Sequence, residues 1–214
     1  MNRYVKWLCL VAACWANSFQ TADAQVDESG KAIKLSVADF IEFWSPSLLL
    51  AYEHPLADRF SIQAEGGYIG YFGGDQQDNQ LSLRGFKTRL EFRHYFIWKR
   101  PNDYIGLQFM FKKTREDRRD NFCRDDCNFF QELDYHLDNT VFAFHFSNGR
   151  KSFIGNHFFV DWGYFVGFRR YNRETSGVPD DATLLEQGIG VRLWEFGKHW
   201  LPSVGLTFKV GFGW

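Results

Sequence analysis

The stretch FKTRLEFRHYFIW, residues 86–98, alternates between large apolar side chains and charged ones. Successive side chains of a β-strand point to opposite faces, so a period of two predicts a strand with two unlike faces. The apolar face would carry Phe86, Leu90, Phe92, Phe96 and Trp98. The charged face would carry Lys87, Arg89, Glu91 and Arg93. This segment predicts a strand that separates an apolar environment from a polar one.

The same alternation recurs along the chain in segments separated by polar turns. The clearest further segments are 59–71, 104–112, 158–170 and 204–214, and weaker ones occupy 33–38, 47–54, 133–147 and 184–194. No stretch after Gln25 has enough consecutive apolar residues for a transmembrane helix. The nine segments therefore predict an all-β fold.

Turn signals divide the chain between these segments. Short turns are predicted at 55–58, at 100–103 and, as a hairpin, at Asn148–Gly149. Longer polar stretches at 73–80, 114–132 and 172–183 predict loops. The alternation changes phase at Gly155–Asn156, which predicts a β-bulge there.

Composition favours a barrel whose apolar face points outward into lipid. Aromatic residues make up 19% of the chain, and they gather near strand ends, as the girdles of membrane barrels do. The opposite face carries charges of both signs, which the interior of a lipocalin-like ligand carrier rarely tolerates. We therefore predict one antiparallel up-and-down transmembrane β-barrel, with a soluble carrier as the alternative. Such barrels have even strand numbers, so we expect eight strands, and ten is the alternative. The net charge of −1 excludes electrostatic binding of nucleic acid as the main function.

Residues 1–24 have the pattern of a secretory signal peptide. A basic start and a short apolar run are followed by the small-x-small sequence Ala22-Asp23-Ala24. We expect cleavage after Ala24, which leaves residues 25–214 as one barrel domain. In the alternative interpretation, a lipoprotein-like box ends at Cys14 and leaves that cysteine lipidated.

The C-terminal run Gly205–Trp214 resembles the assembly signal of Gram-negative outer-membrane barrels, with Phe208, Val210, Phe212 and Trp214 as its alternating apolar residues. The blocks Leu48–Glu53 and Leu90–Phe96 resemble small outer-membrane β-barrel domain proteins, a family with no agreed catalytic residues. The resemblance covers nearly all of residues 25–214. It implies an outer-membrane location in the cell envelope, insertion by the barrel-assembly machinery, contact with outer-membrane lipid, and a structural or surface-interaction role.

The sequence His145-Phe146-Ser147-Asn148 is similar to the His-x-Ser-Asn core of outer-membrane lipid A deacylases. The likeness implies an alternative function in which His145 is the general base and Ser147 the nucleophile. The segment 149–157 lacks the acid that would orient the histidine, although Asp161 could serve by analogy. An ordinary hairpin that happens to carry a Ser and an inward His is the competing interpretation, and the sequence leaves enzymatic activity uncertain.

Cys123 and Cys127 are the cysteines of the exported part, and an even pair in an oxidising compartment predicts a local disulfide. A metal site that uses Asp125 and Asp126 is less consistent with this cysteine spacing. The basic residues of the run Lys112–Arg119 could contact lipopolysaccharide, but its acids favour a solvated flank. We expect no metal, no cofactor and no nucleic-acid partner, and we expect a monomer.

The polar faces of the strands predict an ion-pair network in the lumen of the barrel. An eight-stranded barrel is only wide enough to be filled by side chains, and charges there must pair. The predicted network comprises Glu53, Glu65, Lys87, Arg89, Glu91, Arg93, Asp161, Arg192 and Lys209, with Lys34, Lys112 and Arg169 on the same faces. We expect Glu65 to contact Arg89 or Arg93. A filled lumen predicts a closed barrel and not an open pore.

Overall fold

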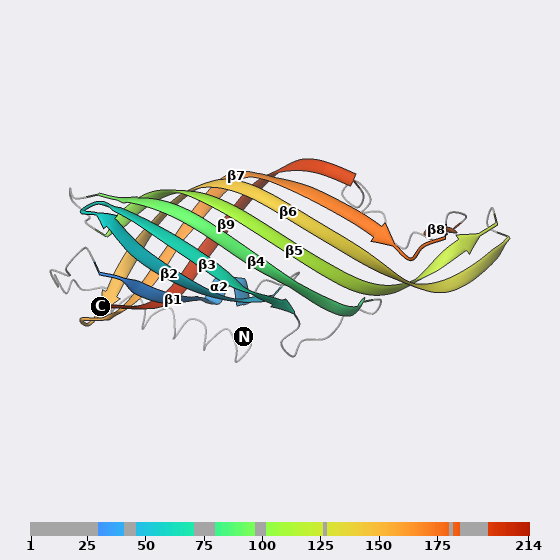
Figure 1. Cartoon of the computed structure of the whole chain (residues 1–214), viewed down its shortest axis with the longest axis horizontal. Helices are drawn as coiled ribbons and strands as arrows, with labels where there is room; N and C mark the ends of the chain where they lie inside the picture. The colour runs from blue at the N-terminus through green and yellow to red at the C-terminus, as the bar shows by residue number, and fades with distance from the viewer. Residues whose placement is uncertain are drawn as a thin grey trace, which may run out of the picture.

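Eight antiparallel strands form a closed ring in the computed structural model, which describes residues 30–40, 46–70, 80–96, 102–125, 128–179, 182–184 and 197–214 (Figure 1). The ring strands are β1 (Ala32–Ser36), β2 (Ser47–Ala57), β3 (Phe60–Gly70), β4 (Gln80–Tyr95), β5 (Asp103–Arg124), β6 (Phe129–Ile154), β7 (Phe158–Ser176) and β9 (Gly197–Gly213). Each strand from β1 to β6 pairs with the next along the chain, and β9 closes the ring between β7 and β1. The structure confirms the predicted all-β, eight-stranded up-and-down barrel.

A ninth strand and a short helix lie outside this ring of strands. Strand β8 (Ala182–Leu184) pairs with residues Phe122–Arg124 of β5. Most of the predicted segment 184–194 lies outside the described residues. Helix α2 (Val37–Phe40) follows β1 directly. The described part of the chain contains no helix of the length and apolarity needed to cross a membrane.

The hairpin predicted at Asn148–Gly149 is wrong, because both residues lie within β6 and pair with Tyr164 and Gly163 of β7. A Cβ at Gly149 would lie 2.5 Å from the Tyr104 hydroxyl, so the glycine makes room for a ring on the neighbouring strand. The turn comes after Ile154, where the phase change predicted a bulge. Gly155 has a φ of +76°, a conformation that glycine adopts without strain.

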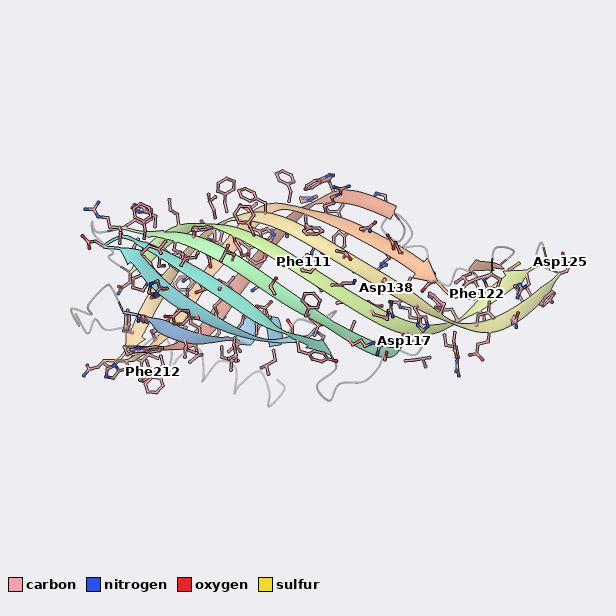
Figure 2. The ribbon with its side chains drawn as sticks, viewed as in Figure 1. Phe111, Asp117, Phe122, Asp125, Asp138 and Phe212 are labelled. Carbon is pink, nitrogen blue, oxygen red and sulfur yellow. The ribbon has the colours of Figure 1, made fainter. Side chains whose placement is uncertain are left out.

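The pleat of the strands separates two environments. The described strand residues that face the lumen are largely polar or small, and buried charged ones occur on β1, β2, β3, β4, β7 and β9. The outer face carries a belt of exposed apolar side chains, many of them rings, which project from the ribbon in Figure 2. Members of this outer belt include Leu50, Tyr68, Phe92, Phe109, Phe146, Trp162, Val166, Val204, Leu206 and Phe212.

Strands β5 and β6 continue beyond the ring as a long two-stranded extension (Figure 1). The loop predicted at 114–132 is therefore wrong over most of its length, since β5 runs unbroken to Arg124. Exposed ion pairs connect the two strands. Arg115 and Asp138, at 2.7 Å, still lie between β4 and β7, and Arg119 and Asp134, at 2.6 Å, lie on the extension itself. The charges of the predicted polar loop thus act as cross-strand pairs, which suit a solvated two-stranded ribbon.

A small apolar cluster supports the extension on its other face. Phe122, Tyr135 and Leu137 pack together there, with Leu133 and Val178 against them. Burial and a hydrogen bond donated to Asp120 raise the pKa of the Tyr135 phenol above its usual value. This cluster gives the ribbon a core of its own outside the ring.

Candidate functional site

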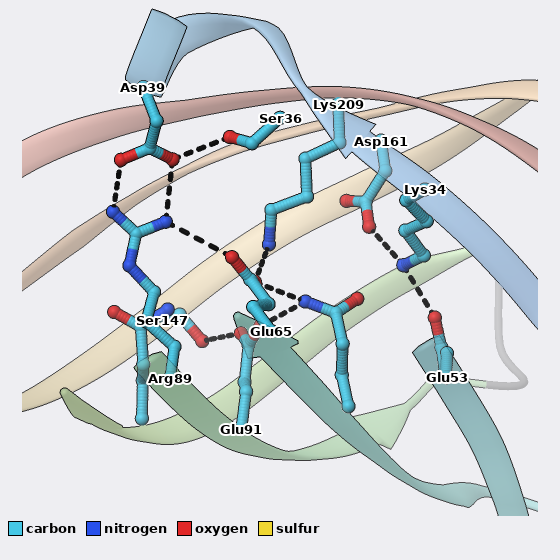
Figure 3. A network of polar contacts seen from close by, with 12 residues as sticks. Lys34, Ser36, Asp39, Glu53, Glu65, Arg89, Glu91, Ser147, Asp161 and Lys209 are labelled. Carbon is cyan, nitrogen blue, oxygen red and sulfur yellow. Dashed lines mark hydrogen bonds and ion pairs between the residues drawn. The ribbon is translucent and has the colours of Figure 1, made fainter. Parts of the chain in front are cut away.

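The first of two ion-pair clusters in the lumen, called the lower network, is centred on Asp161 of β7, which is fully buried. Its carboxylate accepts hydrogen bonds from Lys34 Nζ at 2.5 Å, Arg93 Nη1 at 2.7 Å and the Tyr104 hydroxyl at 2.8 Å. These partners come from β1, β4 and β5, so their contacts join strands on different sides of the ring, and Figure 3 shows the contact of Lys34 with Asp161. Three donors on one carboxylate offset the cost of burying its charge.

Glu53 and Glu91 extend this cluster along β2 and β4. Glu53 pairs with Lys34 at 2.5 Å and with Lys151 of β6 at 2.9 Å. Glu91 pairs with Arg93 at 2.7 Å. Each of these carboxylates also accepts a hydrogen bond from a serine or tyrosine hydroxyl, namely Ser61 and Tyr95 for Glu53 and Ser147 for Glu91.

A second cluster lies around Glu65 and Asp39. Glu65 of β3 pairs with Lys209 of β9 and with Arg89 of β4, the latter at 3.2 Å. Asp39 of α2 contacts Lys87 at 2.6 Å and holds Arg89 through two hydrogen bonds of 2.5 and 2.7 Å. Gln63 connects the two clusters, since its amide nitrogen donates to Glu65 at 2.5 Å and to Glu91 at 3.3 Å.

The structure brings together most of the side chains predicted for the lumen. Eight of them lie in the two connected clusters, namely Glu53, Glu65, Lys87, Arg89, Glu91, Arg93, Asp161 and Lys209. The expected contact of Glu65 is with Arg89, its direct partner in the β3–β4 register. Arg192 lies outside the described residues. Lys112 and Arg169 lie on the same inward faces, and Arg169 stacks over the Tyr171 ring at 5.0 Å.

Sequence reasoning missed four members of the network. Asp39 lies in α2, between the alternating segments, so no strand period could assign it to a face. Lys151 follows Asn148–Gly149, where the sequence wrongly predicted a hairpin. Because β6 continues past these residues, Lys151 lies on the same inward face as His145. Tyr95 and Tyr104 lie near the ends of their strands, where aromatic residues are expected in girdles, yet their hydroxyls donate to Glu53 and Asp161.

His145 and Ser147 share the inner face of β6, but they do not form a base and nucleophile pair. The two imidazole nitrogens of His145 hydrogen-bond to Gln108 at 3.0 Å and to Ser203 at 2.9 Å. The Ser147 hydroxyl donates to Glu91 at 2.6 Å. Glu91 in turn pairs with Arg93, so in this arrangement Ser147 belongs to the ion-pair network, and its hydroxyl donates to Glu91 and not to His145.

Cys123 is disulfide-bonded, and its partner is not among the described residues. Cys127 also lies outside them, so the pairing of Cys123 with Cys127 stays a prediction. The described residues contain no cluster of His, Cys, Asp and Glu that could hold a metal ion.

The predicted pairing has a direct test. A maleimide added to intact cells without reductant should label neither Cys123 nor Cys127, because a disulfide leaves no free thiolate. Peptide mapping after alkylation should recover the two cysteines in one linked fragment. Ready labelling of either thiol, with the reduced and alkylated sample as the positive control, would contradict the pairing.

The apolar residues of the C-terminal run lie on the outer face of β9. Val210, Phe212 and Trp214 are exposed there, while Lys209, which precedes Val210, is buried on the lumen side. The Phe212 ring contacts that of Phe158 at a centroid distance of 5.2 Å, next to the closing pairing of β9 with β1. The run thus forms the last strand that closes the barrel.

In the part of the chain that the structure describes, the lumen is a buried polar network and the outer surface an apolar belt, and His145 and Ser147 are not arranged as a base and a nucleophile. No protein-family model, no curated protein and no solved structure matches the chain.

Proposed function

We propose that this protein is an integral outer-membrane β-barrel with a closed lumen and a structural or surface-interaction role. The observation that carries the proposal is the inverted distribution of side chains across the barrel wall. Charged residues such as Lys34, Arg93 and Asp161 are at most 1% exposed inside the ring, while large apolar side chains remain exposed outside it. Contact of so many large apolar side chains with water is unfavourable, whereas lipid suits this outer face.

A soluble ligand carrier fits these faces less well. A lipocalin-like barrel encloses its ligand in the space that is filled here by paired charges. The outer belt would also expose to water a contiguous apolar surface far larger than monomeric soluble proteins usually carry. The lipid-facing interpretation explains both features with one assumption.

The two ends of the barrel support a surface role. Short turns join β2 to β3 and β6 to β7 at one end, while the β5–β6 extension projects from the other (Figure 1). Outer-membrane barrels place short turns in the periplasm and longer connections outside the cell. The extension would then project from the cell surface, with Phe129 and Phe130 exposed near its tip.

The proposal includes a route to the membrane and a set of partners. Residues 1–24 would direct export and be removed after Ala24. The barrel-assembly machinery would then read Phe208, Val210, Phe212 and Trp214. The inserted protein would be a monomer in contact with outer-membrane lipid, and the charged extension would lie at the height of lipopolysaccharide.

The protein should fractionate with outer membranes and migrate differently on gels before and after boiling. A closed ring of strands resists detergent at room temperature, so the unboiled protein should run as a compact band. The boiled sample should run at the position of the unfolded chain. Recovery in the soluble fraction, or identical migration of the two samples, would contradict the proposal.

The purified protein should give no steady single-channel conductance in planar bilayers. Ion pairs of the described residues cross the lumen from Lys34 to Arg89, and an eight-stranded barrel is narrow enough for such side chains to block a water path. A known open porin reconstituted in parallel is the positive control. Stable, reproducible current steps would show that the network does not close the barrel.

A further inference from the structure

Beyond the end of β1, the described part of β9 loses its strand partner on one side. β1 pairs with β9 only between Ala32–Ser36 and Lys209–Gly213, although β9 begins at Gly197. On the side that faces β1, residues Trp200–Thr207 of β9 have no strand partner among the described residues. The outward side chains of this stretch are accordingly bare, since Val204 is 81% and Leu206 78% exposed. Helix α2 takes the place of the missing strand and contacts both β9 and β2.

Asp39 connects α2 to the far wall of the barrel. Its carboxylate accepts two hydrogen bonds from Arg89 and one from Ser36 at 2.5 Å (Figure 3), and it also accepts one from Lys87. Bidentate pairing with an arginine is the typical recognition of a carboxylate ligand by proteins. The carboxylate is buried, and it belongs to a helix of four residues between two strands. The Asp39 carboxylate is therefore an anion of the chain itself, bound by the basic side chains of Lys87 and Arg89.

The surroundings of this basic site favour an anion. Lys112 is the register partner of Lys87 on the adjacent strand, and it lies on the same inward face. Among the described residues, Glu65 also contacts Arg89, and it pairs with Lys209 as well. The lower network around Asp161 contains its own balance of charges and does not depend on α2.

We propose that Lys87 and Arg89 form a binding site for the carboxylate of a long-chain monocarboxylic acid, which Asp39 occupies as a built-in competing ligand. The incoming carboxylate would displace Asp39 and release α2 from β4. The hydrocarbon chain would then pass between β9 and β2, where α2 lies, toward Val204 and Leu206 on the outer face. The route to lipid rests on the proposed membrane location, whereas the carboxylate site rests on these contacts alone.

The test measures binding of a spin-labelled octadecanoic acid to the folded exported chain in neutral detergent micelles. Its methyl ester, which has the same chain without the charge, is the matched probe. The parent should immobilise the acid and not the ester. Asp39→Asn removes the competing charge, so it should bind the acid about tenfold more tightly, because the fraction of open sites limits the apparent affinity. Arg89→Gln should lose this binding.

A second measurement follows α2 itself. A spin label at Val37→Cys, attached without reductant so that Cys123 stays in its disulfide, should gain mobility when octadecanoate is added. Glu91→Gln is the control, because it alters the lower network and leaves Asp39, Lys87 and Arg89 in place. Its acid binding should equal that of the parent. Unboiled gel migration verifies that each variant is folded.

The outcomes separate the parts of the proposal. Equal binding of acid and ester, or an unchanged affinity in Asp39→Asn, would overturn the site. Acetate that competes as well as octadecanoate would overturn the long-chain ligand and leave a site for small carboxylates. Because the protein is studied in micelles, a failure here is distinct from failure to fractionate with outer membranes.

Discussion

Replacing Arg93 with methionine should lower the free energy of unfolding by about 3–5 kcal/mol, because it removes a cation from a buried cluster and leaves its partners charged. Arg93 contacts Asp161 and Glu91 at 2.7 Å, and Glu53 at 3.5 Å. Methionine retains most of the volume of the arginine stem, so the loss reports on charge more than on packing. The measurement is urea unfolding in lipid vesicles, followed by tryptophan fluorescence.

Arg119→Met is the matched control for this experiment. Arg119 pairs with Asp134 on the β5–β6 extension, where both side chains are exposed to solvent. Water screens an exposed pair, so this change should shift the unfolding midpoint far less. Equal shifts for Arg93→Met and Arg119→Met would mean that the lumen is hydrated and its ion pairs are not structural.

Val166→Arg should destabilise the protein in bilayers by about 2–4 kcal/mol if the outer belt lies in lipid, the cost of an arginine near the bilayer midplane. Val166 is 53% exposed on β7, between Phe146 and Val204 of the neighbouring strands. At a position exposed to water, a surface substitution of this kind usually changes stability by less than about 0.5 kcal/mol. The size of the change in stability therefore shows whether the outer belt is in contact with lipid or with water.

Phe130→Arg places the same charge on an exposed apolar position of the extension, beyond the ring. It should leave stability in bilayers nearly unchanged, because this part of the chain is proposed to lie in water. Unfolding in vesicles of matched thickness compares the two variants directly. Tolerance of Val166→Arg at the level of Phe130→Arg would contradict a lipid-facing belt.

The face of most residues could be predicted from the sequence because the strand period is a local property. The alternation in residues 86–98 assigned Lys87, Arg89, Glu91 and Arg93 to the lumen, where the structure places them. The outward face of Val210, Phe212 and Trp214 followed in the same way. The cross-strand neighbour of Glu65, which is Arg89, could also be predicted as one of two residues, Arg89 or Arg93, since a hairpin restricts the strand register to a few choices.

Contacts across the lumen were decided only by the tertiary structure. Lys34 and Asp161 are 127 residues apart, and they meet because closure of the ring and the stagger of its strands bring β1 and β7 to one height. Asp39 belongs to no strand, so only the end of β1 at Ser36 and the position of α2 reveal its pairing with Arg89. His145 and Ser147 share a face, as their spacing requires, but partners on other strands determine what each one binds. Local periodicity therefore determined what lies inside the barrel, while ring closure decided which charges pair there.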